Sequence, residues 1–281
     1  MPELKLHNLE DLKLLFEKQK RELTESLKYA SYIQKALLPS ETVLQRYFPD
    51  HFLIFKPCSI VSGDFYWVSR KKNRLYFAMA DCTGHGVPGA FLSILGISFL
   101  NQIVDRGDDL NASLILDSLR EFIMKALHQT GDVDEQKDGI DMAFCRIDLD
   151  THTLHFAGAF NPIYIIKNTN KLIEIPGDKM PIGVAAEEEI PFKNHEIDLK
   201  DGDMVYLFSD GYVDQFGGPK GKKFKFRPFR KILLNNCKLP LEIQKKKILE
   251  EHYKWKGKLP QLDDISIFCF CYHPENSVTL G

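Results

Sequence analysis

The chain has 281 residues, enough for one large domain or for a domain with an appendage. Its residues are 44% hydrophobic and 27% charged, as in ordinary globular proteins, and its formal net charge of −2 gives no indication of binding to nucleic acid or to a membrane surface. Six cysteines without a CxxC pair exclude a zinc knuckle and a thioredoxin-like motif, and they indicate a reduced, cytoplasmic protein.

No segment predicts membrane insertion or secretion. The longest apolar run, Gly86 to Leu100, is shorter than the roughly 20 residues that a membrane-spanning helix needs. The N-terminus is charged from Glu3 onward and lacks the apolar core of a signal peptide. We therefore expect a chain that stays in the cytoplasm and does not enter the membrane.

Residues 1–39 are expected to form a helix that Pro39 ends. Positions 12, 16, 19, 23, 26, 30, 33 and 37 have the spacing of heptad a and d sites, and all are apolar except Gln19 and Ser26. Two interpretations remain open: a short coiled-coil seam, or an amphipathic helix that lies on its own domain. We assign residues 1–40 as an N-terminal helical linker, 41–273 as the main domain and 274–281 as a flexible tail.

Short β-type runs and two helices follow the linker. Strands are predicted at 52–55, 65–68 and 75–80, with a turn at Lys71-Lys72-Asn73 between the last two. The helix predicted at 88–104 is apolar on nearly all sides and should be buried, whereas the one at 111–128 is amphipathic. The polar segment 131–139 is expected to be a loop.

The second half of the chain is richer in strands, which are predicted at 142–147, 153–158, 163–167, 171–175, 204–209 and 265–272. The basic segment 217–230 is expected to be a solvated loop, and 241–255 an amphipathic helix. Blocks of strands separated by helix pairs indicate an α+β fold with antiparallel sheets. Two sheets stacked as a β-sandwich, with helix pairs outside, would explain strands that are apolar on both faces.

Acidic residues recur at the predicted strand ends. Asp81 ends one strand and Asp210 another, Asp64 precedes a third, and the pair Asp263-Asp264 precedes the last. An aspartate in such a place is commonly a turn former, so each position alone says little. Gathered at one rim, however, two carboxylates 4 Å apart would cost about 4 kcal/mol. Such a cluster therefore predicts bound cations, and oxygen ligands favour Mg²⁺ or Mn²⁺.

Seven sequence motifs, taken in the order in which they occur, resemble those of a known protein family. They are SGDFYWV, MADCTGHGVPGAFLS, DGIDMAFCRID, AGAFNPIYII, PIGV, LFSDGYVD and QLDDISIF. In this order they resemble the PPM (protein phosphatase 2C-like) superfamily of metal-dependent phosphatases, in the bacterial branch similar to stage II sporulation protein E. The resemblance covers about residues 33–272, and the segment IQKALLP looks like the linker of that branch.

This resemblance implies a central antiparallel β-sandwich flanked by helix pairs, with two divalent ions, Mn²⁺ or Mg²⁺, at one rim. Carried over by motif, Asp64, Asp81 and the backbone carbonyl of Cys82 would hold one metal. Asp81 would bridge to a second metal, whose site Asp210 and Asp263 would complete. Asp264 is the weaker candidate of its pair, since family members often have a neutral residue there.

The implied reaction is hydrolysis of phosphoserine or phosphothreonine in a protein by a water that the two metals activate. His85 is the candidate general acid, although related eukaryotic enzymes have a histidine closer to the bridging aspartate. Those relatives also hold phosphate with an arginine before the first acidic ligand, and residues 56–63 contain none. They carry a further aspartate for a third metal on the strand matching 159–161, and it is missing here.

The resemblance also implies partners. Members of this branch commonly dephosphorylate an antagonist of an anti-sigma factor, and an N-terminal helix often relays a signal by dimerising. We therefore expect a phosphoprotein substrate and no nucleic acid, and we expect residues 1–39 to pair with a second copy of the chain, as a homodimer, or with a partner protein. Two alternatives remain: a catalytically silent module that binds a phosphoprotein, and a metal-dependent hydrolase of a small phosphate compound. The four intact acidic positions argue against the first, and the lack of a nucleoside-binding signature gives no support to the second.

Overall fold

The structure is a computed structural model that describes residues 9–107, 109–130, 137–167, 170–184 and 190–274. Its helices are α1 (Leu9–Leu37), α2 (Glu41–Tyr47), α3 (Val87–Arg106), α4 (Ala112–Ala126), α5 (Gly211–Asp214), α6 (Phe226–Asn236) and α7 (Leu241–Lys256). Its strands are β1 (His51–Lys56), β2 (Phe65–Lys71), β3 (Arg74–Cys82), β4 (Ile140–Asp148), β5 (Thr153–Ala159), β6 (Ile163–Lys167), β7 (Lys171–Ile175), β8 (His195–Asp198), β9 (Met204–Phe208), β10 (Phe216–Gly217), β11 (Lys222–Lys223) and β12 (Ile265–Cys271).

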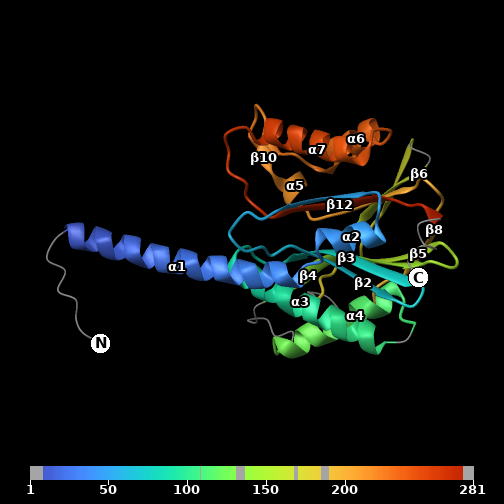
Figure 1. The fold of residues 1–281 in the computed structure, drawn as a ribbon, viewed down its shortest axis with the longest axis horizontal. Coiled ribbons are helices and arrows are strands. Elements are labelled where there is room, and N and C mark those ends of the chain that lie inside the picture. The colour runs from blue at the N-terminus through green and yellow to red at the C-terminus, as the bar shows by residue number, and fades with distance from the viewer. Residues whose placement is uncertain (1–8, 108, 131–136, 168–169, 185–189, 275–281) are drawn as a thin grey trace.

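Two five-stranded antiparallel sheets form the centre of the molecule. One has the strand order β1-β12-β9-β6-β7 and the other β2-β3-β4-β5-β8, while β10 and β11 form a separate hairpin. The helices α3 and α4 cover the outer face of the second sheet, and α6 and α7 cover the outer face of the first (Figure 1). The predicted α+β fold, a β-sandwich between helix pairs, is therefore confirmed.

Apolar side chains fill all three spaces between these four layers. Between the sheets lie Phe77, Phe156, Ile165 and their neighbours, and further apolar clusters lie between each sheet and its helices. Central strands consequently have both faces covered, and every residue of β9 is buried. This arrangement explains why the central strands are apolar runs rather than alternating patterns.

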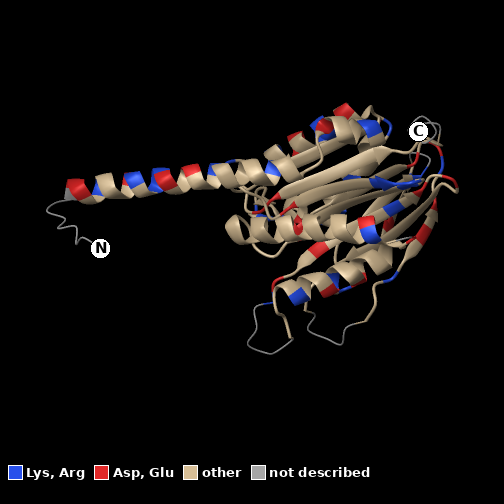
Figure 2. Cartoon of the chain, turned by 60° about the horizontal axis from the view of Figure 1, so that its bottom comes forward, with Lys and Arg blue, Asp and Glu red and all other residues tan. Residues whose placement is uncertain are grey.

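Helix α1 extends away from the sandwich over most of its length (Figure 1). Lysine, arginine and acidic residues alternate along it (Figure 2), while Leu12, Phe16 and Leu23 are each more than half exposed. Of the two interpretations of the linker, the helix lying on its own domain is therefore wrong for this portion. Only the last turns of α1 reach the body of the protein, where Ser31 and Gln34 are buried.

Most predicted elements agree with the structure to within a few residues. The helix prediction for residues 1–39 matches α1, although residues 1–8 lie outside the described part, as do 131–136 and the tail 275–281. The loop predicted at 217–230 is wrong, because Lys222–Lys223 forms a strand and α6 begins at Phe226. The many lysine and arginine residues of this segment obscured the start of the amphipathic helix α6, which buries Phe229 and Leu233, four residues apart. Helix α2, capped by Ser40, was also not predicted.

Among the described helices, α3 has the length and apolar composition of a membrane-spanning segment. Half of that apolar window is buried inside the protein. The helix packs against β2, β3 and α4, and Leu92, Ile97 and Leu100 are almost fully enclosed. Its hydrophobicity is thus explained by its place as a core helix.

Phe77 tests the importance of the layer between the sheets. Its ring contacts the rings of Phe48, Phe268 and Phe270. We expect Phe77→Ala to lower the free energy of unfolding by about 3–5 kcal/mol, because the substitution leaves a cavity in a rigid core. Urea unfolding of this variant beside Phe91→Ala, whose ring is 66% exposed, measures the difference. Equal effects of the two substitutions would contradict this account of the core.

Candidate metal centre

Acidic side chains from both sheets converge on one pocket. Asp81 lies near the end of β3, Asp210 follows β9 and Asp263 precedes β12. The residues that line the pocket are Asp81, Cys82, Thr83, Gly84, His85, Asp141, Asp210 and Asp263. Of the residues predicted to form the site, the structure thus brings Asp81, Cys82, His85, Asp210 and Asp263 together.

Asp64 is buried and does not itself line the pocket, but it lies close enough to Asp81 to raise the pKa of that acid, and it connects the two sheets. It immediately precedes β2, yet its Oδ2 accepts hydrogen bonds from Ser209 Oγ at 2.7 Å and from Ser266 Oγ at 2.6 Å, which belong to the other sheet. Its second oxygen, Oδ1, is buried without a hydrogen-bond partner in the described part of the chain. Burial raises the pKa of Asp64 to about 7, although the two hydroxyls lower it. A buried carboxylate oxygen of this kind is a suitable cation ligand.

Asp264 has a different role from its neighbour Asp263. Its two carboxylate oxygens accept hydrogen bonds from the backbone N–H groups of Cys58 and Gly63, each at 2.6 Å. Asp264 is buried and does not line the pocket. The side chain therefore holds the loop that leads to Asp64, and we assign it a positioning role.

Two glycines allow the segments to approach this closely. A Cβ on Gly211 would lie 1.9 Å from the backbone oxygen of Asp264, and one on Gly63 would lie 2.8 Å from that of Gly84. The same Cβ on Gly63 would lie 3.3 Å from the backbone carbonyl oxygen of Cys82. Larger residues would push the acidic segments apart, so these glycines set the size of the cluster.

Burial and mutual repulsion raise the pKa values of the acids around the pocket. Burial is the main cause for Asp81, whose pKa lies well above its usual value, and for Asp141 and Asp210, whose pKa values rise to about 7 and about 6. The charge of Lys223 lowers the pKa of Asp210, and that of His85 lowers the pKa of Asp263, but both acids remain above their ordinary values. These two side chains therefore do not fully offset the negative charge of the acids. The available ligand atoms are carboxylate oxygens, so hard divalent cations fit this set of residues.

His85 lies in the exposed turn between β3 and α3 and lines the pocket. Its proximity to Asp263 is evident from its effect on the pKa of that acid. The histidine is therefore at the mouth of the pocket, where it could meet an incoming group. Its assignment as the general acid stays a prediction.

Asp141 is the acidic pocket residue that the sequence analysis missed. It sits in β4 directly opposite Asp81 of β3 in the antiparallel register. The motif DGIDMAF places an acid near the start of a predicted strand, but only the pairing of that strand with β3 in this register puts the acid beside Asp81. The segment 159–161, by contrast, contributes no carboxylate to the pocket, as its sequence indicated.

The raised pKa values predict how stability depends on pH without divalent ions. A carboxyl whose pKa is higher in the folded than in the unfolded protein stabilises the fold at low pH, and this stabilisation is lost as the pH rises toward the folded value. For Asp141 the window runs from about 4 to about 7. With chelator at pH 8, we expect Asp141→Asn to raise the free energy of unfolding by about 2–4 kcal/mol, and to have no effect near pH 4.

Chemical unfolding at the two pH values measures this difference, and the exposed substitution Asp198→Asn serves as the control. Saturating Mn²⁺ should abolish or reverse the advantage of Asp141→Asn at pH 8, because a bound cation stabilises the ionised carboxylate. If Asp141→Asn is no more stable than the wild-type chain at pH 8 in chelator, the ionised Asp141 does not destabilise the fold and the prediction is wrong.

Comparisons with known proteins agree with this fold. A sequence model of the family described as stage II sporulation protein E (SpoIIE) matches residues 71–273. The phosphoserine phosphatase RsbU of Bacillus subtilis is 24% identical over 196 residues, which are 69% of this chain and 55% of RsbU. The chain thus spans about half the length of this curated relative.

Two solved structures share the fold. The SiaA-PP2C domain of Pseudomonas aeruginosa has 28% sequence identity and a TM-score of 0.81, and the match covers 91% of this chain and 99% of that domain. RsbX in complex with magnesium has 12% identity and a TM-score of 0.52, with 79% of this chain and 94% of RsbX covered. The second likeness concerns the fold alone.

Proposed function

This chain belongs to the stage II sporulation protein E family, and from that premise we propose that it is a metal-dependent protein phosphatase that hydrolyses phosphoserine or phosphothreonine. It carries a phosphatase domain of the PPM type, as its likeness to the SiaA-PP2C domain shows. The observation that supports activity is the group of four carboxylates that line the pocket, together with Asp64, whose Oδ1 is buried without a hydrogen-bond partner among the described residues.

The acids divide between two metal positions in this proposal. Asp64, Asp81 and the backbone carbonyl of Cys82 would hold one ion, and Asp81, Asp210 and Asp263 would hold the other. Carboxylate ligands favour Mn²⁺ or Mg²⁺, and RsbX, a protein of the same fold, was solved with magnesium. When bound, such ions lower the pKa of a water molecule and stabilise negative charge on phosphoryl oxygens.

The residues of the chain position and protonate the reactants. Asp264 fixes the loop before Asp64 through two backbone N–H groups, and Ser209 and Ser266 fix the orientation of the Asp64 carboxylate. His85, at the exposed mouth of the pocket, would give a proton to the serine or threonine oxygen that leaves the phosphate. Attack by water requires no nucleophilic side chain.

Helix α1 provides a route for regulation. The Gln34 side chain donates to the backbone oxygen of Ser62 at 2.6 Å and accepts from the backbone N–H of Ser62 at 3.0 Å, and it also donates to Ser93 in α3 at 2.8 Å. Ser62 is two residues before Asp64. A movement of α1 would therefore shift a metal ligand, and we propose that the exposed apolar stripe of α1 pairs with that of a second chain to control this movement.

The proposed setting is a cytoplasmic signalling pathway. By analogy with its family, we assign the substrate as a phosphorylated protein that antagonises an anti-sigma factor. A silent phosphoprotein-binding module is the rival function, and turnover separates the two.

Asp81→Asn tests activity directly. Removal of a carboxylate shared by both metal positions should lower turnover of an aryl phosphate with Mn²⁺, and of a phosphoserine peptide, by about 10³-fold or more. Asp198→Asn, on the exposed face of β8, should retain full activity. If the wild-type chain binds the phosphopeptide but never releases phosphate, the binding-module function is correct.

Gln34→Ala tests the link between α1 and the site. Loss of these buried hydrogen bonds should destabilise the Ser62–Asp64 loop by about 1–3 kcal/mol and weaken activation by Mn²⁺ several-fold. The substitution of the exposed neighbour, Lys35→Ala, is the control.

Gln19→Leu should strengthen self-association, because it replaces a polar residue within the exposed apolar stripe of α1, and sedimentation measures this change. Activity that is indifferent to Gln34 and to deletion of residues 1–30 would remove the regulatory proposal.

A further inference from the structure

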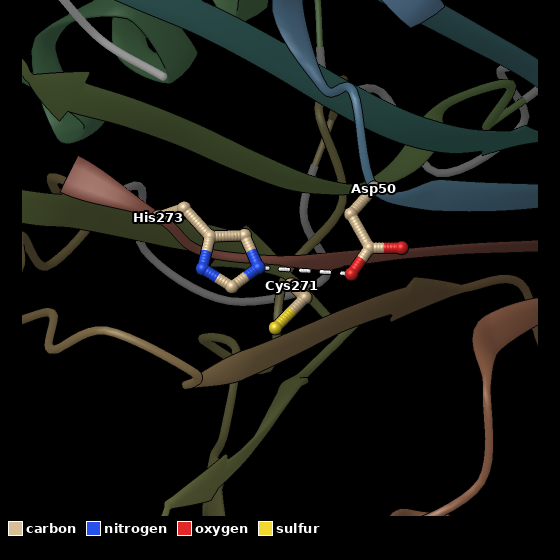
Figure 3. A group of neighbouring side chains, drawn as sticks. All are labelled: Asp50, Cys271 and His273. Atoms are coloured by element: carbon tan, nitrogen blue, oxygen red, sulfur yellow. Dashed lines mark ion pairs between the residues drawn. The ribbon is translucent and has the colours of Figure 1, made fainter. Parts of the chain in front are cut away.

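A second group of metal-binding side chains lies at the other end of β12. Asp50 precedes β1, Cys271 ends β12 and His273 follows two residues later (Figure 3). Ligand atoms from these three side chains all lie within 4.8 Å of one another. Since Asp263 and Asp264 precede the first residue of β12, the length of the strand places this group about 25 Å from the first site.

The backbone holds this group in place. The N–H of Cys271 donates to the carbonyl oxygen of Asp50 at 2.9 Å, directly beside the antiparallel pair His51 and Phe270. Asp50 and Cys271 therefore remain neighbours for as long as β1 pairs with β12. The two side chains do not depend on a flexible loop to meet.

His273 is oriented as metal-binding histidines usually are. Its Nδ1 lies 2.7 Å from Asp201 Oδ1, so this carboxylate selects the tautomer with a proton on Nδ1. The other nitrogen, Nε2, faces Asp50 Oδ2 at 3.7 Å (Figure 3). A carboxylate behind a histidine fixes the ring and increases its basicity toward a metal, which is the common arrangement around zinc.

Carboxylates surround this group, since Asp50 Oδ2 lies 3.7 Å from His273 Nε2 and Asp201 Oδ1 lies 2.7 Å from His273 Nδ1. A bound cation would offset this negative charge, and the thiol of Cys271 would release its proton to solvent on binding. Cys271 and His273 also border an apolar hollow formed with Tyr47, Pro49 and Leu149.

We propose that Cys271, His273 and Asp50 form a second metal site, which takes Zn²⁺ and is distinct from the carboxylate centre. A thiolate and an imidazole select a transition metal rather than Mg²⁺, and a water would complete the tetrahedron. Ligand atoms around tetrahedral zinc lie about 3.3–3.6 Å apart, so only small rotations of the partly exposed side chains of Asp50 and His273 are needed. The ion would clamp the chain entering β1 to the end of the last strand.

Cobalt substitution tests the site, because Co²⁺ bound to a thiolate absorbs in the near ultraviolet whereas Co²⁺ bound only to carboxylates does not. The chain of residues 1–281, titrated with Co²⁺, should show this band at a stoichiometry of one per chain, and Zn²⁺ should displace Co²⁺ and remove the band. Cys271→Ser should abolish the band. Cys58→Ser, which removes the other partly buried cysteine, and Asp81→Asn, which alters the carboxylate centre, should retain it.

A second readout keeps the proposal testable if Cys271→Ser folds poorly. At a Zn²⁺ concentration 100 times the dissociation constant, binding to the folded state alone stabilises a protein by about 2.7 kcal/mol, so Zn²⁺ should raise the melting temperature of the wild-type chain. Asp50→Asn and His273→Ala alter exposed or half-exposed side chains and should reduce this shift. A thiolate band that survives Cys271→Ser, or a wild-type chain with neither band nor thermal shift, would overturn the site.

Discussion

The hydrogen bonds of the Asp64 carboxylate with Ser209 and Ser266 join the two sheets at the rim where the acids meet. Asp64 enters the molecule with one sheet, while both serines come from the other. Because the carboxylate is buried, these bonds strongly constrain its position, and the oxygen left without a partner is available to a cation. The geometry of the candidate metal centre therefore depends on how the two sheets are positioned relative to each other.

A cluster of buried carboxylates destabilises the fold when no cation is bound, because the acids repel one another and lose contact with water. Apolar packing elsewhere must compensate for this cost. Three apolar clusters, one between the sheets and one beneath each helix pair, bury the large side chains that stabilise the fold. The strain is confined to one rim, where burial raises the pKa values of Asp64 and Asp141 to about 7. A stable framework that carries a strained polar site is the usual arrangement of a functional centre.

Two structural elements connect the candidate metal centre to other parts of the protein: helix α1 and strand β12. Gln34 connects the projecting helix α1 to the loop that carries Asp64, so a movement of the helix has a direct physical path to a proposed metal ligand. Strand β12 has Asp263 and Asp264 before its start and Cys271 at its end. A clamp at that end would restrain the strand that also supports the carboxylate centre, while differing from it in ligand chemistry.

The sequence by itself determined the fold class, most strands and helices, and the acids at the strand ends, because hydrophobic periodicity and turn residues act over a few neighbouring positions. Its ordered motifs also indicated the family. It missed α6, whose buried Phe229 and Leu233 are masked by charged neighbours. The tertiary structure alone decided that Asp141 faces Asp81, that Asp264 binds backbone rather than lining the pocket, and that Asp201 orients His273. Each of these relations joins residues far apart in the chain, and their distances are set by strand register and layer packing, which no local pattern encodes.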